Sequence, residues 1–167
     1  MAARMLFQTS NDLTLTIARI VLALVFLGHG TQKMFGWFGG PGFSRAIDIF
    51  EQTMGIPPAL TVLAMVAEVF GGLGLLVGLL TRIAALGVLG VMIVAPFANG
   101  LYVRFFMNWQ GRNPGEGYEY HLLAIALILV VLVHGAGAGS LDRLIALRST
   151  TAPEGSAARS EGVGGRG

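Results

Sequence analysis

The sequence has no cysteine among its 167 residues and few charged residues. The lack of cysteine excludes disulfide bonds, thiol redox chemistry and metal sites with thiolate ligands. Charged residues make up 12% of the chain, against about 25% in soluble domains. Basic residues form no run and do not alternate with aromatic residues, so the sequence does not favour nucleic acid as a partner. With 54% hydrophobic residues and a mean hydropathy of +0.71, the composition indicates an integral membrane protein.

Four apolar segments are each about long enough to cross a hydrocarbon core of about 30 Å. We expect these spans at residues 13–30, 59–80, 83–101 and 121–138. Residues 44–55 have helical spacing, with apolar and charged side chains on different faces, which predicts a short helix at the membrane interface between the first two spans. The sequence therefore predicts an all-α membrane protein, a four-transmembrane-helix bundle.

The bundle is expected to form a single domain over residues 1–148. Residues 149–167 form a polar tail with too little apolar surface to fold alone, so we expect this tail to be disordered or docked on a partner.

Glycines and aromatic residues predict how the spans pack and where they leave the membrane. A tight turn at Thr81-Arg82 predicts an antiparallel hairpin of the second and third spans. Small residues allow two helices to approach closely, and the glycines expected to do so are Gly71, Gly74, Gly78 and Gly87. The expected interfacial anchors are Trp37, Trp109 and Arg82. Arg19, about two turns into the first span, is expected to snorkel to the nearer surface.

The distribution of basic residues predicts the orientation of the four spans. With four spans, both termini lie on one side, and that side carries Arg4, Arg82, Arg143, Arg148, Arg159 and Arg166. The other side carries Lys33, Arg45, Arg104 and Arg112. Because cytoplasmic loops are enriched in Lys and Arg, we expect both termini in the cytoplasm and both large loops outside.

Glu68 is the one charged residue between residues 59 and 80, and it lies near the middle of this expected span. A carboxylate at that depth of a bilayer costs about 3 kcal/mol or more, so it faces protein, water or a ligand and is a candidate functional residue. The structural alternative is a protonated or hydrogen-bonded glutamate that holds helices together.

The expected topology brings further polar side chains to the outer half of the bundle. His29 and Asn99 lie near the outer ends of the first and third spans, and Glu119 and His121 open the fourth. Facing helices build ligand and cofactor sites in this way. We therefore expect a quinone or another small redox-active lipid to bind there. Imidazole and amide groups would bond a carbonyl oxygen, and Glu68 or Glu119 would handle the coupled proton.

Other roles stay open for the same residues. His29, His121, Glu68 and Glu119 have chemistry suited to iron or zinc, but the sequence has no H-x-x-x-H or E-x-x-H pair, and we predict no metal site. His29 equally fits a packing histidine at the membrane edge. Glu119-Tyr120-His121 could also simply cap the fourth span, because a helix N-terminus favours acidic groups. We also expect no covalently bound cofactor.

Several segments resemble the DoxX family of small bacterial four-helix membrane proteins. They keep the family's order and spacing over roughly residues 13–145: Ala18-Arg19, Phe26–Gly36, Gly42-Phe43, Gly55–Pro57, Glu68–Gly72, Gly78–Ala85, Tyr118–Tyr120 and Gly139–Asp142. This resemblance implies a multi-pass protein of the bacterial cytoplasmic (inner) membrane.

The resemblance also implies a redox context. The family includes a quinone-reducing thiosulfate dehydrogenase subunit, and other members are associated with membrane oxidoreductase complexes and oxidative-stress handling. The polar positions that match its pattern are Arg19, His29, Gln32, Lys33, Glu68, Arg82 and Glu119. The sequence departs after the third span, where family members often carry a histidine and this chain has Phe105-Phe106-Met107-Asn108-Trp109.

Two function hypotheses follow. The first is a membrane subunit associated with a redox or electron-transfer complex, accessory rather than a stand-alone enzyme, that binds a quinone or lipid in the outer half of the bundle. The alternative is a non-catalytic structural or assembly subunit of a larger respiratory or photosynthetic membrane complex. In both, membrane lipids and other membrane-protein subunits are the expected partners.

Overall fold

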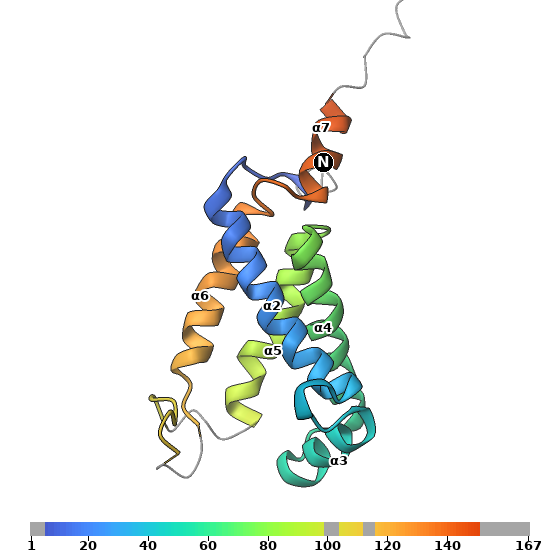
Figure 1. The fold of residues 1–167 in the computed structure, drawn as a ribbon, viewed down its shortest axis with the longest axis vertical. Helices are drawn as coiled ribbons and strands as arrows, with labels where there is room; N and C mark the ends of the chain where they lie inside the picture. Colours follow the sequence, from blue (N-terminus) through green and yellow to red (C-terminus); the bar gives the residue numbers. More distant parts are fainter. Residues whose placement is uncertain (1–5, 99–103, 112–115, 151–167) are drawn as a thin grey trace, which may run out of the picture.

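The part of the chain that the structure describes is entirely helical. The computed structural model describes residues 6–98, 104–111 and 116–150. Over these residues it has six α-helices, one 3-10 turn and no strand (Figure 1). The elements are α2 (Leu13–Phe35), η1 (Trp37–Gly39), α3 (Phe43–Met54), α4 (Pro58–Val77), α5 (Thr81–Ala98), α6 (Glu119–His134) and α7 (Leu141–Thr150). The predicted all-α class is confirmed, whereas residues 151–167 of the predicted tail lie outside the described residues.

Four of the helices form a bundle. Each of α2, α4, α5 and α6 packs against two of the others, through the pairs α2–α4, α4–α5, α5–α6 and α2–α6. We call one end of the bundle the amino-terminal end, where α2 and α5 begin and α4 and α6 end. The other is the loop end, which carries α3, η1 and residues 104–111 and 116–118. Figure 1 shows α7 and the segment just before α2 at the first end and α3 at the second.

The bundle has an apolar core and an apolar outer surface. The core joins all four helices through side chains such as those of Phe26, Leu75, Val88 and Ile128. Large apolar side chains also point outward, among them Leu24, Leu63, Phe70 and Leu123, each more than half exposed. A helix that is apolar all round belongs in a membrane or in a large protein core, and this chain is too small for the second. The protein is therefore a membrane protein.

Three of these helices meet the length of a membrane span. They are α2, α4 and α5, with 23, 20 and 18 residues. Helix α6 is equally apolar but has 16 residues, which corresponds to about 24 Å. It is shorter than predicted because Gly135, Gly137 and Gly139 take left-handed backbone angles directly after it. The prediction of four spans is therefore not settled by helix length.

Helix bounds differ from the predictions at two further places. The first helix does not stop at Gly30 but continues to Phe35, since α4 packs along this stretch and Gly36 ends the helix with a φ of 74°. The turn between the second and third spans lies at Gly78–Leu80, and Thr81 already begins α5. The extension of α2 matters most, because it places Lys33 on the helix, one turn after His29.

The prediction that Arg19 snorkels to the surface is wrong. Its side chain is 1% exposed and lies inside the amino-terminal end of the bundle. Its guanidinium donates hydrogen bonds to the carbonyl oxygens of Leu75, Leu76 and Ala136, with distances of 2.8 Å to Leu76 and 2.9 Å to Ala136. Carbonyls at the C-terminal end of a helix carry partial negative charge. They therefore hold the cation inside the protein.

A second buried charge closes the same end. Asp142, at the start of α7, is 1% exposed, and its two carboxylate oxygens accept hydrogen bonds from the amides of Leu80 at 2.7 Å and Thr81 at 2.9 Å. These are amides at the start of α5 that have no partner within their own helix. The predicted packing glycine Gly78 lies at the contact between the end of α4 and the start of α7. It has a φ of 68°, and a Cβ there would lie 2.5 Å from that of Ser140.

Glycines set the distance between neighbouring helices. At Gly71 an added Cβ would lie 2.9 Å from Val88 Cγ1, and at Gly74 it would lie 3.0 Å from Ala84 Cβ, so both positions bring α4 close to α5. At Gly87 the nearest atom would be at an ordinary 3.8 Å. The contact of α2 with α4 is closer still, because a Cβ on Gly30 would lie 2.9 Å from the backbone nitrogen of Val69.

This contact predicts opposite effects for two glycines of α2. Gly28 has open space where a Cβ would be added, whereas Gly30 meets Val69 and Glu68. Alanine is more favourable than glycine within a helix by about 1 kcal/mol, so Gly28→Ala should raise the free energy of unfolding by up to about that amount. Gly30→Ala should lower it by about 1–3 kcal/mol, because the two helices must move apart.

Denaturant unfolding of both variants in mixed micelles, followed by circular dichroism, tests this pair. Gly28→Ala is the matched control for the loss of a glycine from α2. Equal destabilisation by both substitutions would show that the close approach at Gly30 does not hold α2 against α4.

Candidate functional site

Polar side chains of three helices gather toward the loop end of the bundle. We call His29, Lys33, Glu68, Tyr120 and His121 the polar cluster. The first two come from α2, Glu68 from α4, and the last two from the first turn of α6. The predicted candidates His29, Glu68 and His121 belong to this cluster. Asn99 lies outside the described residues, so the structure does not place it.

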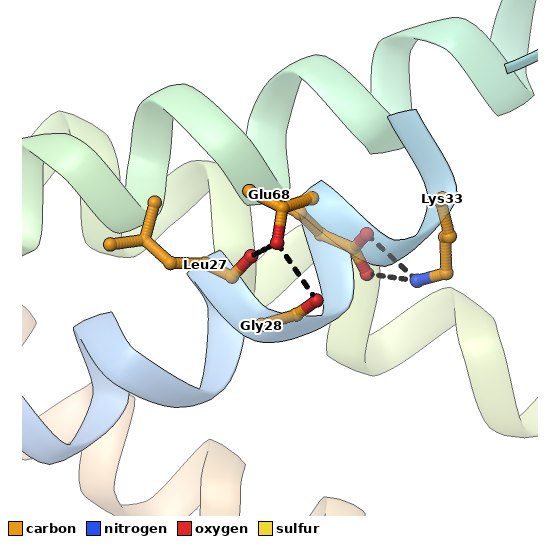
Figure 2. A network of polar contacts seen from close by, with 5 residues as sticks. Leu27, Gly28, Lys33 and Glu68 are labelled. Carbon is orange, nitrogen blue, oxygen red and sulfur yellow. Dashed lines mark hydrogen bonds and ion pairs between the residues drawn. The ribbon is translucent and has the colours of Figure 1, made fainter. Parts of the chain in front are cut away.

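The centre of the cluster is an ion pair between Lys33 and Glu68. Lys33 Nζ lies 2.5 Å from Glu68 Oε1 and 2.7 Å from Oε2 (Figure 2). The side chain of Glu68 is 2% exposed and that of Lys33 is 22% exposed. Since Gly30 lets α2 come close to α4 just before Lys33, the lysine can reach the carboxylate in the middle of α4. The pair is buried on the glutamate side and partly open on the lysine side.

One buried hydroxyl near the pair is already used within α2. Thr31 Oγ1 donates to the carbonyl oxygens of Leu27 at 2.6 Å and Gly28 at 3.2 Å. Figure 2 shows Leu27 and Gly28 beside Glu68 and Lys33. Thr31 therefore offers no free donor to a ligand.

The two histidines of the cluster come from neighbouring helices, since His29 belongs to α2 and His121 to α6, and these two helices pack against each other. The side chain of His29 is exposed. The cluster therefore extends from the buried carboxylate of Glu68 to the surface at His29.

Tyr120 completes the cluster on its inner side. Its ring packs against the apolar core. The Oη of Tyr120 and the Nδ1 of His121 are buried, and neither has a hydrogen-bond partner among the described residues. The cluster thus combines an ammonium, a carboxylate, two imidazoles and a phenol. These groups can bind a polar head group and transfer protons.

Glu119 is used differently from the other predicted site residues. Its Oε1 accepts hydrogen bonds from the amide of Met107 at 2.8 Å and from Trp109 Nε1 at 3.3 Å. Since Glu119 is the first residue of α6, its carboxylate ties the preceding loop to the start of this helix. The predicted alternative of a structural role at the N-terminus of α6 fits this arrangement.

The predicted interfacial anchors lie at both ends of the bundle. At the loop end, Trp37 is 57% exposed and Trp109 is 83% exposed. At the amino-terminal end, Arg82 Nη2 donates to the carbonyl oxygens of Val133 at 2.9 Å and Gln8 at 3.3 Å. These places agree with an interfacial position, and anchoring in lipid stays a prediction.

We also searched the described residues for a metal site and for a groove away from the cluster. Among the residues that the structure describes, no three His, Asp or Glu side chains are grouped so that they could hold a metal ion. An open groove of about 460 Å³ lies between α4 and α5, lined by apolar residues such as Phe70, Leu73 and Ile83. The groove offers no charged group to fix a polar head group.

The sequence analysis left Lys33 and Tyr120 out of the candidate site. Lys33 follows His29 by four residues, a spacing that places both on one face of a helix. That signal was hidden because the first span was expected to end at Gly30. Tyr120 stands between two candidates, but no local pattern shows that its ring packs against the core of the bundle and that its hydroxyl is buried.

The ion pair predicts strong coupling between Lys33 and Glu68. Removing one member of a buried pair costs about 3–5 kcal/mol, and partial exposure of Lys33 reduces this to about 2–4 kcal/mol for Lys33→Met. The double variant Lys33→Met/Glu68→Gln should therefore lose less unfolding free energy than the two single variants lose together, by at least about 1 kcal/mol. Unfolding free energies of the four proteins measure this coupling.

The exposed Glu51 of α3 supplies a control, since Glu51→Gln removes a carboxylate outside the bundle core and should leave the unfolding free energy unchanged. Additive losses in the double variant would show that Lys33 and Glu68 do not interact in the folded protein.

Comparisons with known proteins place the chain in a family. The sequence model of the DoxX family matches residues 14–100. The chain is 29% identical over 135 residues to "Inner membrane protein YqjF" of Escherichia coli (strain K12), a match that covers 81% of this chain and 94% of that protein. It is 32% identical over 137 residues to an uncharacterized protein of Haemophilus influenzae, with 77% of this chain and 87% of that protein covered. No solved structure gives a significant match. The chain belongs to the DoxX family.

Proposed function

We propose that this protein is an accessory membrane subunit of a redox complex and binds the head group of a quinone, or a related lipid, at the polar cluster. One observation carries this proposal. A buried ion pair, Lys33–Glu68, joins α2 to α4, and α6, which packs against α2, carries in its first turn two residues, Tyr120 and His121, that each have a buried polar atom without a partner among the described residues. A head group that needs hydrogen bonds and protons fits such a place.

The proposed topology puts the polar cluster on the outer side of a bacterial cytoplasmic membrane. The name of the Escherichia coli relative refers to the inner membrane. Helix α6 acts as the fourth span, with its short length accommodated by a locally thinner bilayer. Helix α3 then lies at the outer interface, in agreement with its exposed Arg45, Asp48 and Glu51. Both termini are in the cytoplasm, as the distribution of basic residues predicts.

The chemistry of quinone reduction matches the groups of the cluster. Reduction of a quinone to a quinol takes two electrons and two protons. A partner redox protein supplies the electrons, since the chain has no cysteine and no cofactor-attachment motif. Lys33 binds Glu68 and is partly exposed, and His29, one turn earlier on α2, is exposed, so we propose that protons reach the ring from the aqueous phase through these side chains.

Substitution of Glu68 and His29 tests the proposed site. Glu68→Gln should lower quinone-dependent electron transfer in native membranes at least about tenfold, a change of about 1.4 kcal/mol in the barrier. His29→Ala should lower it several-fold, because one donor near the surface is lost. The amount of assembled protein is measured in the same membranes by blotting.

His134→Ala is the matched control for His29→Ala. His134 is exposed and lies at the opposite end of the bundle, with Nδ1 3.0 Å from the carbonyl oxygen of Val130. Unchanged electron transfer in both Glu68→Gln and His29→Ala, with normal protein levels, would refute quinone binding at the polar cluster.

A non-catalytic structural subunit is the second candidate function. The observation that favours it is the strong exposure of aromatic side chains on two loops at the loop end: Trp37 (57%), Phe38 (79%), Phe106 (71%) and Trp109 (83%). Exposed aromatic residues are common at protein interfaces. In this role they would dock the bundle onto a larger respiratory or photosynthetic complex, and the polar cluster would only join helices.

Native separation of mild-detergent extracts distinguishes the two candidates, with mass spectrometry of co-migrating proteins and lipids. The redox proposal expects a quinone to co-migrate with the protein. The structural role expects a large complex without bound quinone, and loss of the protein from that complex when Trp37 and Trp109 are both replaced by Ala. Intact assembly of the doubly substituted protein would contradict the structural role.

A further inference from the structure

The apolar groove between α4 and α5 lies in one half of the bundle only. Its lining residues on α4 extend from Val66 to Val77, and those on α5 from Ile83 to Gly87. The groove therefore begins near the middle of α4 and ends at the amino-terminal end of the bundle. None of its lining residues is polar or charged, so its occupant must be apolar along this whole length.

Small residues create the groove. Gly71 and Gly74 let α4 approach α5 closely, and neither has a side chain to cover the contact. Gly87 leaves further space, because a Cβ added there would meet no atom nearer than that of Ala67, at 3.8 Å. The bottom of the groove is therefore backbone and methyl groups, with a volume of about 460 Å³ above it.

The rim of the groove favours a flexible chain over a second protein helix. It carries the large side chains of Phe70, Leu73 and Ile83, which are 64%, 43% and 52% exposed. Two membrane helices pack closely when small residues lie at the surface where they meet. Here the small residues lie below large ones, and a hydrocarbon chain can enter where the backbone of another helix is held away.

The length of the groove corresponds to one leaflet of a bilayer. The stretch Val66–Val77 is about 17 Å long at about 1.5 Å per residue, and half of a hydrocarbon core is about 15 Å thick. Both α4 and α5 are long and apolar enough to cross a membrane. An acyl chain from the leaflet at the amino-terminal end would therefore reach along the groove to the middle of the membrane.

Positive charge adjoins the open end of the groove. Arg82 directly precedes the lining residue Ile83, and Arg143 directly follows Asp142, whose carboxylate binds the amide of the lining residue Leu80. Both arginines are partly exposed, whereas Asp142 is 1% exposed and is bound to backbone amides. Guanidinium groups bind phosphate well, so this end of the groove suits an anionic head group.

We infer that the groove holds an acyl chain of an anionic phospholipid, whose head group lies at the amino-terminal end beside Arg82 and Arg143. The site is on the α5 side of α4, whereas Glu68 binds Lys33 of α2. The inference therefore does not depend on quinone binding at the polar cluster. A lipid held there would fill the space that the glycines leave between the two helices.

Native mass spectrometry of the purified full-length protein tests this inference, with dioleoyl phosphatidylglycerol added to detergent micelles. The wild type should retain one lipid molecule. Gly87→Leu should weaken its binding at least about tenfold, because the new side chain takes the place of part of the acyl chain. Gly90→Leu is the matched control, since Gly90 is on the same helix, is exposed and does not line the groove.

The head group is tested with dioleoyl phosphatidylcholine, which has no net charge. The wild type should bind phosphatidylglycerol at least about fivefold more tightly, as expected for an anionic head group beside arginine. Arg143→Gln should reduce this preference, and Arg45→Gln, on the exposed face of α3 at the loop end, should leave it unchanged. Equal binding of the two lipids by the wild type would refute the assigned head group.

Unfolding temperatures without added lipid show that the variants are folded. Leucine is more favourable than glycine in a helix, so neither Gly87→Leu nor Gly90→Leu should unfold below the wild type. Equal retention of phosphatidylglycerol by the wild type and Gly87→Leu, or no retention by the wild type, would overturn the inference. A dimer that Gly87→Leu separates and Gly90→Leu leaves intact would instead assign the groove to a second copy of the chain.

Discussion

The structure depends on a close contact between α2 and α4 that carries a buried ion pair. An ionised carboxylate away from water is unfavourable by several kcal/mol unless a partner neutralises it. Lys33 supplies that partner because α2 extends past Gly30 and because the missing side chain at Gly30 lets the two backbones approach. A charged residue in an apolar helix, the glycine opposite it and the length of the preceding helix are thus parts of one arrangement.

The two ends of the bundle show that a buried charge is not by itself evidence of a functional site. At the amino-terminal end, Arg19 binds carbonyls at the end of α4, and Asp142 binds amides at the start of α5. Both charges are used by backbone groups that would otherwise lack partners, which is a structural role. At the loop end, the partner of Glu68 is a side chain that is 22% exposed, whereas Arg19 and Asp142 are each 1% exposed. That difference favours ligand binding at the loop end.

The sequence was informative where the physics is local. Apolar segments predicted the helices, and the isolated charge at Glu68 marked the residue around which the cluster is built. The fate of Arg19 could not be predicted, because its acceptors come from α4 and from the loop after α6. Lys33 was placed beyond the first span because polar residues gather after Gly28, where the helix was expected to leave the hydrocarbon. Packing against α4 keeps that stretch helical, and this contact is not visible in the sequence of α2.

Ligand binding and electron supply are separate requirements in this family member. The cluster provides hydrogen-bonding groups and a route for protons, but the chain has no cysteine to hold a metal cluster or a covalently attached cofactor. A quinone bound near Glu68 would therefore be reduced by electrons from a second protein, whose cofactor must approach from the loop end or through the bilayer. The exposed Trp37 and Trp109 lie at that end. Under the proposed function, docking of a partner on the aromatic loops would bring its electron donor close to a quinone bound at the polar cluster, so the loops and the cluster would serve one function.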